Sequence, residues 1–162
     1  MQHASPCGFY GSDRCRCRDS EVKKYQQKIS GPILDRIDLQ VELQRLSTDD
    51  RFAESGEDES PRLRASVEAA RNRQRERFAS HAIPCNAAIP GGHVREFCCF
   101  SDRGFTHFRE TIDKASLSTR SMDRLAKVAR TVADLAASET VEPSHINKAA
   151  SFVIGGMLRE AV

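Results

Sequence analysis

The sequence predicts a mainly α-helical fold in which the end of an α/β core, reduced to one strand, precedes a bundle of helices. Apolar residues recur at three- and four-residue spacing through most of the second half, as in amphipathic helices packed on a core. Residues 37–43 instead alternate apolar and polar residues, as a half-buried strand does. An acid-rich stretch at residues 47–61 separates the two patterns. We therefore divide the chain into a core remnant at residues 1–46, a linker at 47–61 and a helical domain at 62–162.

Length, charge and apolar content limit the class of protein. The 162 residues suffice for one core with an appended segment, and the formal net charge of +2 leaves only a local basic surface for nucleic-acid contacts. No stretch is apolar enough to span a bilayer, and the start lacks the apolar core of a signal peptide, so we expect a cytoplasmic protein. In that compartment, the six cysteines are more typical of metal ligands or reduced thiols than of disulfides.

The first segment is expected to hold one helix and one strand after an irregular loop. Residues 1–19 contain glycines, cysteines and arginines without any regular period. A helix is expected at residues 19–30, ending before a Gly-Pro pair, and the strand follows at 37–43. A half-buried strand without a second strand leaves its ladder groups unsatisfied. We therefore expect its partners to lie elsewhere, in a longer protein of which this chain is the C-terminal piece.

The helical domain is expected to contain about four helices. The first begins after Pro61 and is rich in arginine. The others are expected at residues 102–115, 119–136 and 142–158, where apolar residues fall on one face. In the last of these, Pro143 occupies a position that suits the first helical turn.

Three cysteines near the start form a candidate metal site. Cys7 follows a proline and precedes a glycine, and Cys15 and Cys17 form a C-x-C pair, which resembles a knuckle whose thiolates converge on one cation. A structural zinc site needs four ligands. His3 is one candidate for the fourth, and the alternative is a loop of reduced thiols without metal.

Arg36 is the candidate catalytic residue. It lies between a short apolar turn and the predicted strand, so two regular elements would fix its backbone while the guanidinium projects from an edge. This placement is typical of an arginine finger, which stabilises charge on a transferring phosphoryl group. The alternative is an edge salt bridge with Asp35 or Asp38, which would contribute little.

The helix from Thr119 carries a second candidate. Its apolar residues share one side, and Arg120, Arg124 and Lys127 share the other. A solvated basic face over a core stripe is one interpretation, and contact of Arg120 with a nucleotide phosphate is the other. In the preceding arginine-rich helix, alternate arginines are spread around the axis, which favours scattered surface charge over a nucleic-acid-binding stripe. The sequence has no phosphate-cradling G-x-x-x-x-G-K-[ST] motif, so we expect no nucleotide hydrolysis by this chain alone.

Several stretches together resemble the C-terminal part of the Mg-chelatase-like AAA+ ATPases of the ComM (YifB) type. They are PCGFYG, CRC, ISGPILDRIDLQVEL, LSTRSMDRLAKVARTVADLA and VEPSHINKAASF. The resemblance implies that Arg36 is a trans-acting arginine finger and that Arg120 is the sensor-2 residue of the lid. It also implies a homo-hexameric motor that uses ATP and Mg²⁺ in the complete parent and is associated with DNA branch migration during natural transformation.

The chain departs from that family pattern in two places. Ser5 stands where the pattern has a second cysteine, which weakens the metal site, and His3 falls about where the sensor-1 asparagine is expected. Partners expected from the resemblance are an N-terminal AAA+ core or neighbouring subunits, and DNA. The alternative function, from a different class, is a free-standing zinc-knuckle and helical-bundle module that binds DNA or a protein.

Overall fold

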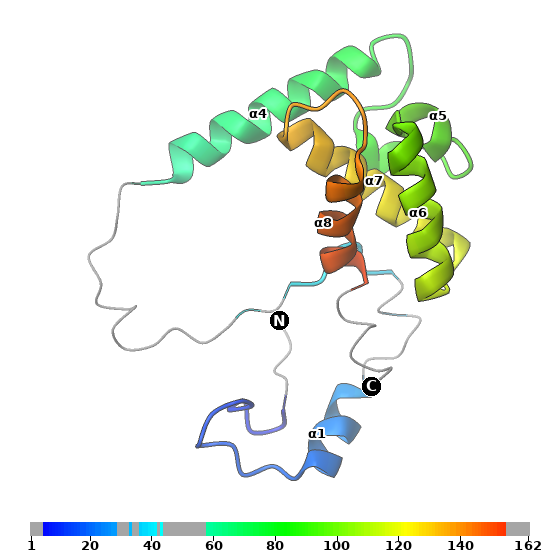
Figure 1. Ribbon diagram of the computed structural model, residues 1–162. Helices are drawn as coiled ribbons and strands as arrows, with labels where there is room; N and C mark the ends of the chain where they lie inside the picture. Colours follow the sequence, from blue (N-terminus) through cyan, green and yellow to red (C-terminus); the bar gives the residue numbers. More distant parts are fainter. Residues whose placement is uncertain (1–4, 29–32, 34–35, 42, 44–57, 155–162) are drawn as a thin grey trace. The chain divides into compact units, whose positions relative to one another are not determined.

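The computed structural model describes residues 5–28, 33, 36–41, 43 and 58–154. The chain divides into two compact units, Met1–Ile37 and Asp38–Val162, here called the N-terminal unit and the helical unit (Figure 1). No described helix combines the length and the apolar character that crossing a bilayer requires.

Residues 5–28 of the N-terminal unit form a loop of turns followed by the helix α1 (Asp19–Gln26), which confirms the predicted helix. The backbone N–H of Arg18 donates to the Glu21 carboxylate at 2.8 Å, satisfying one of the free donors at the helix start. Val22 is the buried apolar residue of α1. The loop before it turns at Gly8 and Gly11, both with positive φ, which glycine adopts without steric cost.

The described part of the predicted strand is not a strand. Its apolar side chains are exposed, from 41% at Ile37 to 75% at Leu43. The backbone N–H of Gln40 donates to the Phe152 carbonyl at 2.8 Å, a single bond where a ladder would need a row. The described residues offer no second strand to complete that ladder, which is the physical reason that the alternating pattern stays unpaired.

The helical unit is built around α7. Its elements are α4 (Ser60–Arg77), the 3₁₀ turn η1 (Asn86–Ala88), α5 (Val94–Cys98), α6 (Asp102–Ala115), α7 (Thr119–Leu135) and α8 (Pro143–Val153). Helix α7 contacts α4, η1, α5 and α8, and α6 packs on α8. The four helices expected in this part of the chain are confirmed, and the mainly α-helical fold with them.

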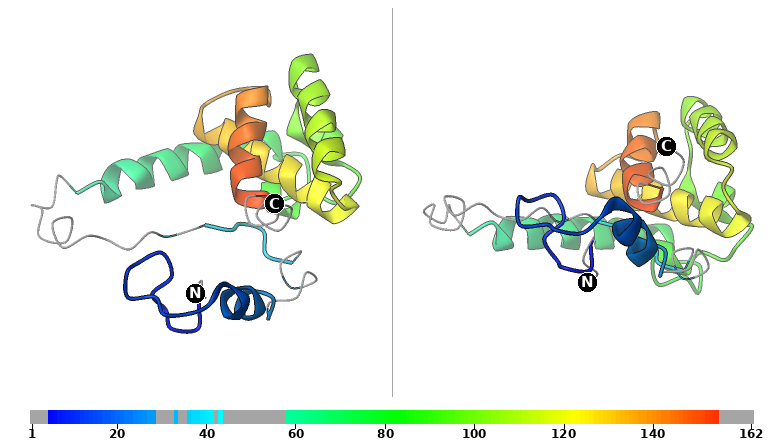
Figure 2. Two further views of the ribbon diagram at one scale, coloured as in Figure 1. Left: turned by 60° about the horizontal axis from the view of Figure 1, so that its bottom comes forward. Right: turned by 90° about the horizontal axis from the view of Figure 1, so that it is seen from below.

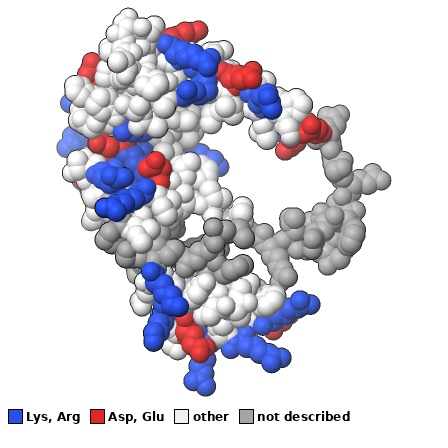
Figure 3. All heavy atoms as spheres, turned by 180° about the vertical axis from the view of Figure 1, so that it is seen from behind, with Lys and Arg blue, Asp and Glu red and all other residues white. Residues whose placement is uncertain are grey.

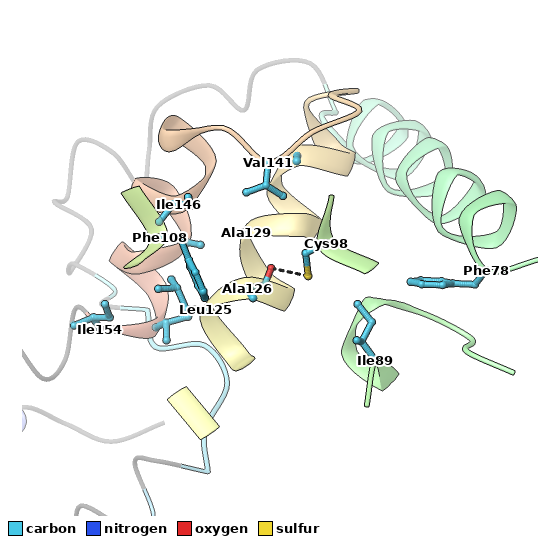
Figure 4. Close-up of a cluster of buried hydrophobic side chains, with 13 residues drawn as sticks. Phe78, Ile89, Cys98, Phe108, Leu125, Ala126, Ala129, Val141, Ile146 and Ile154 are labelled. Atoms are coloured by element: carbon cyan, nitrogen blue, oxygen red, sulfur yellow. Dashed lines mark hydrogen bonds between the residues drawn. The ribbon is translucent and has the colours of Figure 1, made fainter. Parts of the chain in front are cut away.

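One apolar cluster holds the helical unit together. Phe108 of α6, Leu125 of α7 and Ile146 of α8 point into the same interior (Figure 4). Ala126 and Ala129 are fully buried along α7, and such small side chains allow neighbouring elements to approach closely. Burying a side chain the size of Leu125 contributes about 1.5–3 kcal/mol.

A close backbone contact joins the start of α6 to the segment before α8. Phe100 and Val141 form a parallel β-bridge, and the Val141 N–H donates to the Cys99 carbonyl at 2.9 Å. A Cβ atom on Gly104 would lie 2.0 Å from the Val141 carbonyl oxygen, so only glycine fits there.

Helix α4 is anchored by its C-terminal half. Ala70 and Gln74 are its buried residues, and Phe78, which follows the helix, is also buried. Leu63 and Val67 in the first half are each 54% exposed. Both views in Figure 2 show this half extending away from the other helices of the unit.

Buried charges fix the end of α4 to α7. Asp134 is fully buried, and it pairs with Arg77 of α4 and, at 3.1 Å, with Arg130 one turn before it on α7. The side-chain amide of Asn86 donates to Asp134 at 2.8 Å. Arg130 also donates to the carbonyls of Cys98 and Glu139, at 3.2 and 2.7 Å. Arg77 is therefore a structural residue, whereas the sequence favoured scattered surface charge for this helix.

We expect Asp134→Ala to lower the free energy of unfolding by about 3–5 kcal/mol, because it leaves Arg130 buried without its carboxylate. Chemical denaturation followed by circular dichroism measures this loss. Asp113→Ala is the matched control, since Asp113 is an exposed acid on α6. An equal effect of the two substitutions would contradict the structural role of Asp134.

The same carboxylate predicts how stability depends on pH. Burial alone would raise the pKa of Asp134, but hydrogen bonds from Arg77 and Asn86 and the nearby Arg130 charge outweigh it, so the pKa lies below the ordinary 3.8. The contribution of Asp134 to the free energy of unfolding is complete above pH 3.8. It is lost as the pH falls through the lower pKa that Asp134 has in the folded state. The unfolding free energy of Asp134→Asn should therefore fall less steeply than that of the unmodified chain in this acid range.

Candidate functional site

Three cysteine side chains of the N-terminal loop converge. The Sγ atoms of Cys7, Cys15 and Cys17, here called the cysteine cluster, all lie within 4.8 Å of one another. Turns bring them together, with the Cys15 N–H donating to the Ser12 carbonyl at 2.9 Å. Cys7 Sγ and Cys15 Sγ are 3.7 Å apart, and all three cysteines are free thiols. Two sulfur ligands on a tetrahedral zinc ion lie ~3.8 Å apart, so the Cys7 to Cys15 distance fits two ligands of a shared metal.

Ser5 lies against this cluster. Its side chain is fully buried, and its Oγ is 3.4 Å from Cys7 Sγ. This is the position where the resemblance predicts a cysteine. His3, the fourth ligand considered from sequence, lies outside the described residues.

The neighbours of Cys7 favour its thiolate. Hydrogen bonds lower the pKa of Cys7 to about 6, with the Ser5 hydroxyl contributing most and the Phe9 backbone next. The pKa of Cys17 is raised, chiefly by its hydrogen bond to Cys7. The metal-free cluster is therefore expected to carry its first negative charge on Cys7. In the helical unit, burial raises the pKa of Cys98 to about 12, as expected of an inert structural thiol.

Arg36 lies in an exposed turn of the N-terminal unit. Its backbone N–H donates to the Ile33 carbonyl at 3.0 Å. Among the described acidic residues none forms an ion pair with Arg36, Asp38 included, and Asp35 lies outside the described part of the chain. The side chain is thus exposed to solvent at this turn.

Arg120 lies in the first turn of α7, in the helical unit, and is exposed. The helix begins at a cap, in which the Ser118 hydroxyl accepts from the Ser121 N–H at 3.2 Å. Arg124 and Lys127, the two other basic residues that the sequence placed on the same face of α7, have partners within the helical unit. Arg124 is buried and donates to the Ser121 hydroxyl, and Lys127 donates to the Ala87 carbonyl at 3.3 Å. The prediction of a solvated basic face is wrong for Arg124, because α7 is packed on several sides.

The described residues 5–28 of the N-terminal unit carry more basic than acidic side chains. Among the charged side chains on the lower part of the face in Figure 3, lysines and arginines predominate over acids. The basic residues are Arg14, Arg16, Arg18, Lys23, Lys24 and Lys28, and the acidic ones are Asp13, Asp19 and Glu21. This local excess is the kind of surface that attracts phosphates.

Two family models match the chain. The model "Magnesium chelatase, subunit ChlI C-terminal" matches residues 57–152 and the model "Magnesium chelatase, subunit ChlI" matches residues 2–51. An uncharacterised protein of Mycobacterium tuberculosis is 33% identical over 147 residues. YifB of Escherichia coli, itself uncharacterised, is 32% identical over 150 residues, and competence protein ComM of Haemophilus influenzae is 30% identical over 154.

These similarities cover most of this chain and a minor part of each relative. Each alignment spans 91% of the chain, but only 29% of the M. tuberculosis and E. coli proteins and 28% of ComM. The first model covers the whole of α4 to α7 and most of α8, and the second covers the cysteine cluster and Arg36.

We expect Cys7 of the metal-free chain to react with iodoacetamide with a midpoint near pH 6, because its thiolate forms above that pH and is lost below it. Ser5→Ala should raise the midpoint toward the ordinary 9.0 by removing the largest stabilising bond. Mass spectrometry of the labelled peptides gives the rate at each pH. Ser12→Ala is the control, since that hydroxyl donates to the Phe9 carbonyl. A Cys7 midpoint near 9 in the unmodified chain would contradict the assignment.

Proposed function

Because the chain belongs to the magnesium chelatase subunit ChlI family, with ComM and YifB relatives, we propose that it supplies the arginine finger and the lid of a ring-forming AAA+ ATPase. The observation that carries this proposal is the exposed Arg36 on a turn whose backbone is held by Ile33. A guanidinium placed so can reach a nucleotide bound by another subunit. There it would stabilise the charge that develops on the γ-phosphate during transfer.

Arg120 is proposed to act from the lid. It lies at the start of α7, and α7 contacts most other elements of the helical unit. A contact between Arg120 and a nucleotide phosphate would therefore move the whole unit with the helix, because its core is shared. This is how the presence of the γ-phosphate would be converted into lid movement.

The nucleotide itself would be held by other residues than these. The sequence contains no phosphate-cradling glycine-rich motif, so ATP and Mg²⁺ are proposed as cofactors of the complete parent, and the chain alone is proposed to be inactive. Zn²⁺ is proposed for the cysteine cluster, since three convergent thiolates are ligands that Zn²⁺ prefers.

The assembly is proposed to be a homo-hexamer that moves DNA. The H. influenzae relative is named a competence protein, and a role in competence is proposed for the parent of this chain. In this chain, the basic excess over residues 5–28 supports contact with DNA phosphates without base recognition.

A second candidate function is a free-standing module that binds DNA through the N-terminal unit. The juxtaposition of the cysteine cluster and the basic residues favours it. Salt dependence separates the two candidates. We expect DNA binding by the isolated chain to be weak and to decline steeply as salt rises. A sequence-specific complex that survives moderate salt would favour the module.

Arg36→Ala is the main test, made in a hybrid in which this chain replaces the matching segment of E. coli YifB. Turnover of ATP should fall by roughly three orders of magnitude, the scale on which arginine fingers act, while nucleotide binding and ring assembly stay nearly unchanged. Mixing Arg36→Ala subunits with subunits unable to bind nucleotide should restore some turnover, because a mixed interface combines an intact pocket with an intact finger.

Arg64→Ala is the control, since Arg64 is an exposed arginine of α4 that the proposal gives no role. It should leave turnover unchanged. Normal ATP hydrolysis by assembled Arg36→Ala rings would reduce Arg36 to a surface charge and would sink the proposal.

A further inference from the structure

The position of Ser5 is unusual for a serine in a surface loop. Its side chain is fully buried, whereas Cys7 two residues later is exposed. A buried hydroxyl needs a hydrogen-bond or ligand partner, since leaving it unsatisfied costs free energy. Its contact in the structure is the thiol of Cys7, at 3.4 Å, and Cys7 is the cysteine that also contacts Cys15.

The Ser5 to Cys7 and Cys7 to Cys15 distances match those between neighbouring ligands of one ion, and all three sulfur atoms lie within 4.8 Å of one another. With Zn–S near 2.3 Å and Zn–O near 2.0–2.2 Å, a sulfur and an oxygen on a tetrahedral zinc lie ~3.6 Å apart. The Ser5 to Cys7 distance of 3.4 Å is close to this value, as the Cys7 to Cys15 distance of 3.7 Å is to the sulfur–sulfur spacing.

We propose that the Ser5 hydroxyl oxygen is the fourth ligand of a divalent metal site whose other ligands are the three thiolates of the cysteine cluster. This inference rests on the proposed zinc binding by the cluster. It assigns the fourth position to a described residue and removes His3 from the ligand set. The site is then a three-sulfur, one-oxygen site that accepts Zn²⁺, or Co²⁺ as a spectroscopic substitute.

A hydroxyl ligand has a consequence for exchange of the ion. The oxygen is a weaker ligand than a thiolate, so the ion should bind more weakly and leave more readily than from a four-thiolate site. Residues 5–18 contain turns but no helix or strand. Loading and loss of the ion would therefore order and release this loop, because metal binding supplies folding free energy to such segments.

The test is a Co²⁺ titration of the full chain under reducing conditions, followed by competition with Zn²⁺. The unmodified chain should bind one ion, with the visible absorption of tetrahedral cobalt. Ser5→Cys should bind roughly tenfold or more tightly and should strengthen the sulfur-to-cobalt charge-transfer band. Ser12→Cys is the matched control, because it adds a thiol in the same loop at an exposed position. Ser12→Cys should change neither the affinity for Co²⁺ nor the intensity of the charge-transfer band.

Two further variants test whether the fourth ligand is the Ser5 oxygen. Ser5→Ala should weaken Co²⁺ binding by roughly tenfold or more, whereas His3→Ala should leave it unchanged. X-ray absorption of the zinc-loaded unmodified chain should give three sulfur atoms near 2.3 Å and one oxygen near 2.0–2.2 Å. Circular dichroism of the full chain checks that each variant keeps its helices.

The outcomes separate the two proposals. If the unmodified chain binds neither ion, both the zinc proposal and the Ser5 assignment are overturned. If it binds an ion but Ser5→Ala has no effect, or His3→Ala weakens binding instead, the zinc proposal stands and the Ser5 assignment falls. If Ser5→Cys and Ser12→Cys tighten Co²⁺ binding equally, the Ser5 assignment is also overturned.

Discussion

The helical unit depends on the ion pairs of one buried carboxylate. Asp134 accepts from Arg77, Asn86 and Arg130, and so joins the end of α4, the turn η1 and the centre of the bundle. A fully buried charge is tolerated only when it is paired and hydrogen-bonded, and here those conditions are met only if three segments take their native positions together. Arg130 extends the constraint by donating to the carbonyls of Cys98, at the end of α5, and of Glu139, after α7. The network therefore adds directional bonds to the apolar contacts that hold α4 and η1 on α7.

The N-terminal unit is held by different forces. Within its described residues, Val22 is the buried apolar side chain, and the loop before α1 is ordered by turn hydrogen bonds and glycines with positive φ. A segment with so little apolar burial gains stability from local contacts or from a bound ion rather than from a core. The convergence of three thiols and a buried hydroxyl is consistent with the second source. A chemical site and a structural support would then be the same group of atoms.

Burial separates the arginines of this chain into two kinds. Arg77, Arg124 and Arg130 lie largely inside the helical unit, where their guanidinium groups bind a carboxylate, a hydroxyl or carbonyl oxygens. Arg36 and Arg120 are exposed, each beside a fixed backbone feature, a turn for the first and a capped helix start for the second. The first kind sets the shape of the unit. The second kind lies at the surface, and its proposed role is contact with a nucleotide phosphate.

The sequence by itself determined the longer helices α1, α4, α6, α7 and α8 and their order, but not the short α5 and η1, because apolar periodicity, capping residues and Pro143 are local signals. It also singled out the three cysteines, whose spacing is typical of a metal knuckle. Three features came only from tertiary structure. The alternation at residues 37–43 predicts a strand, but a strand forms only beside another, and none lies among the described residues. Helical spacing placed Arg124 with Arg120 on a solvated face, but how many sides of α7 are covered depends on elements distant in sequence. Asp134, Arg77 and Asn86 look like surface residues in their own segments, and their burial becomes favourable only when packing brings opposite charges together.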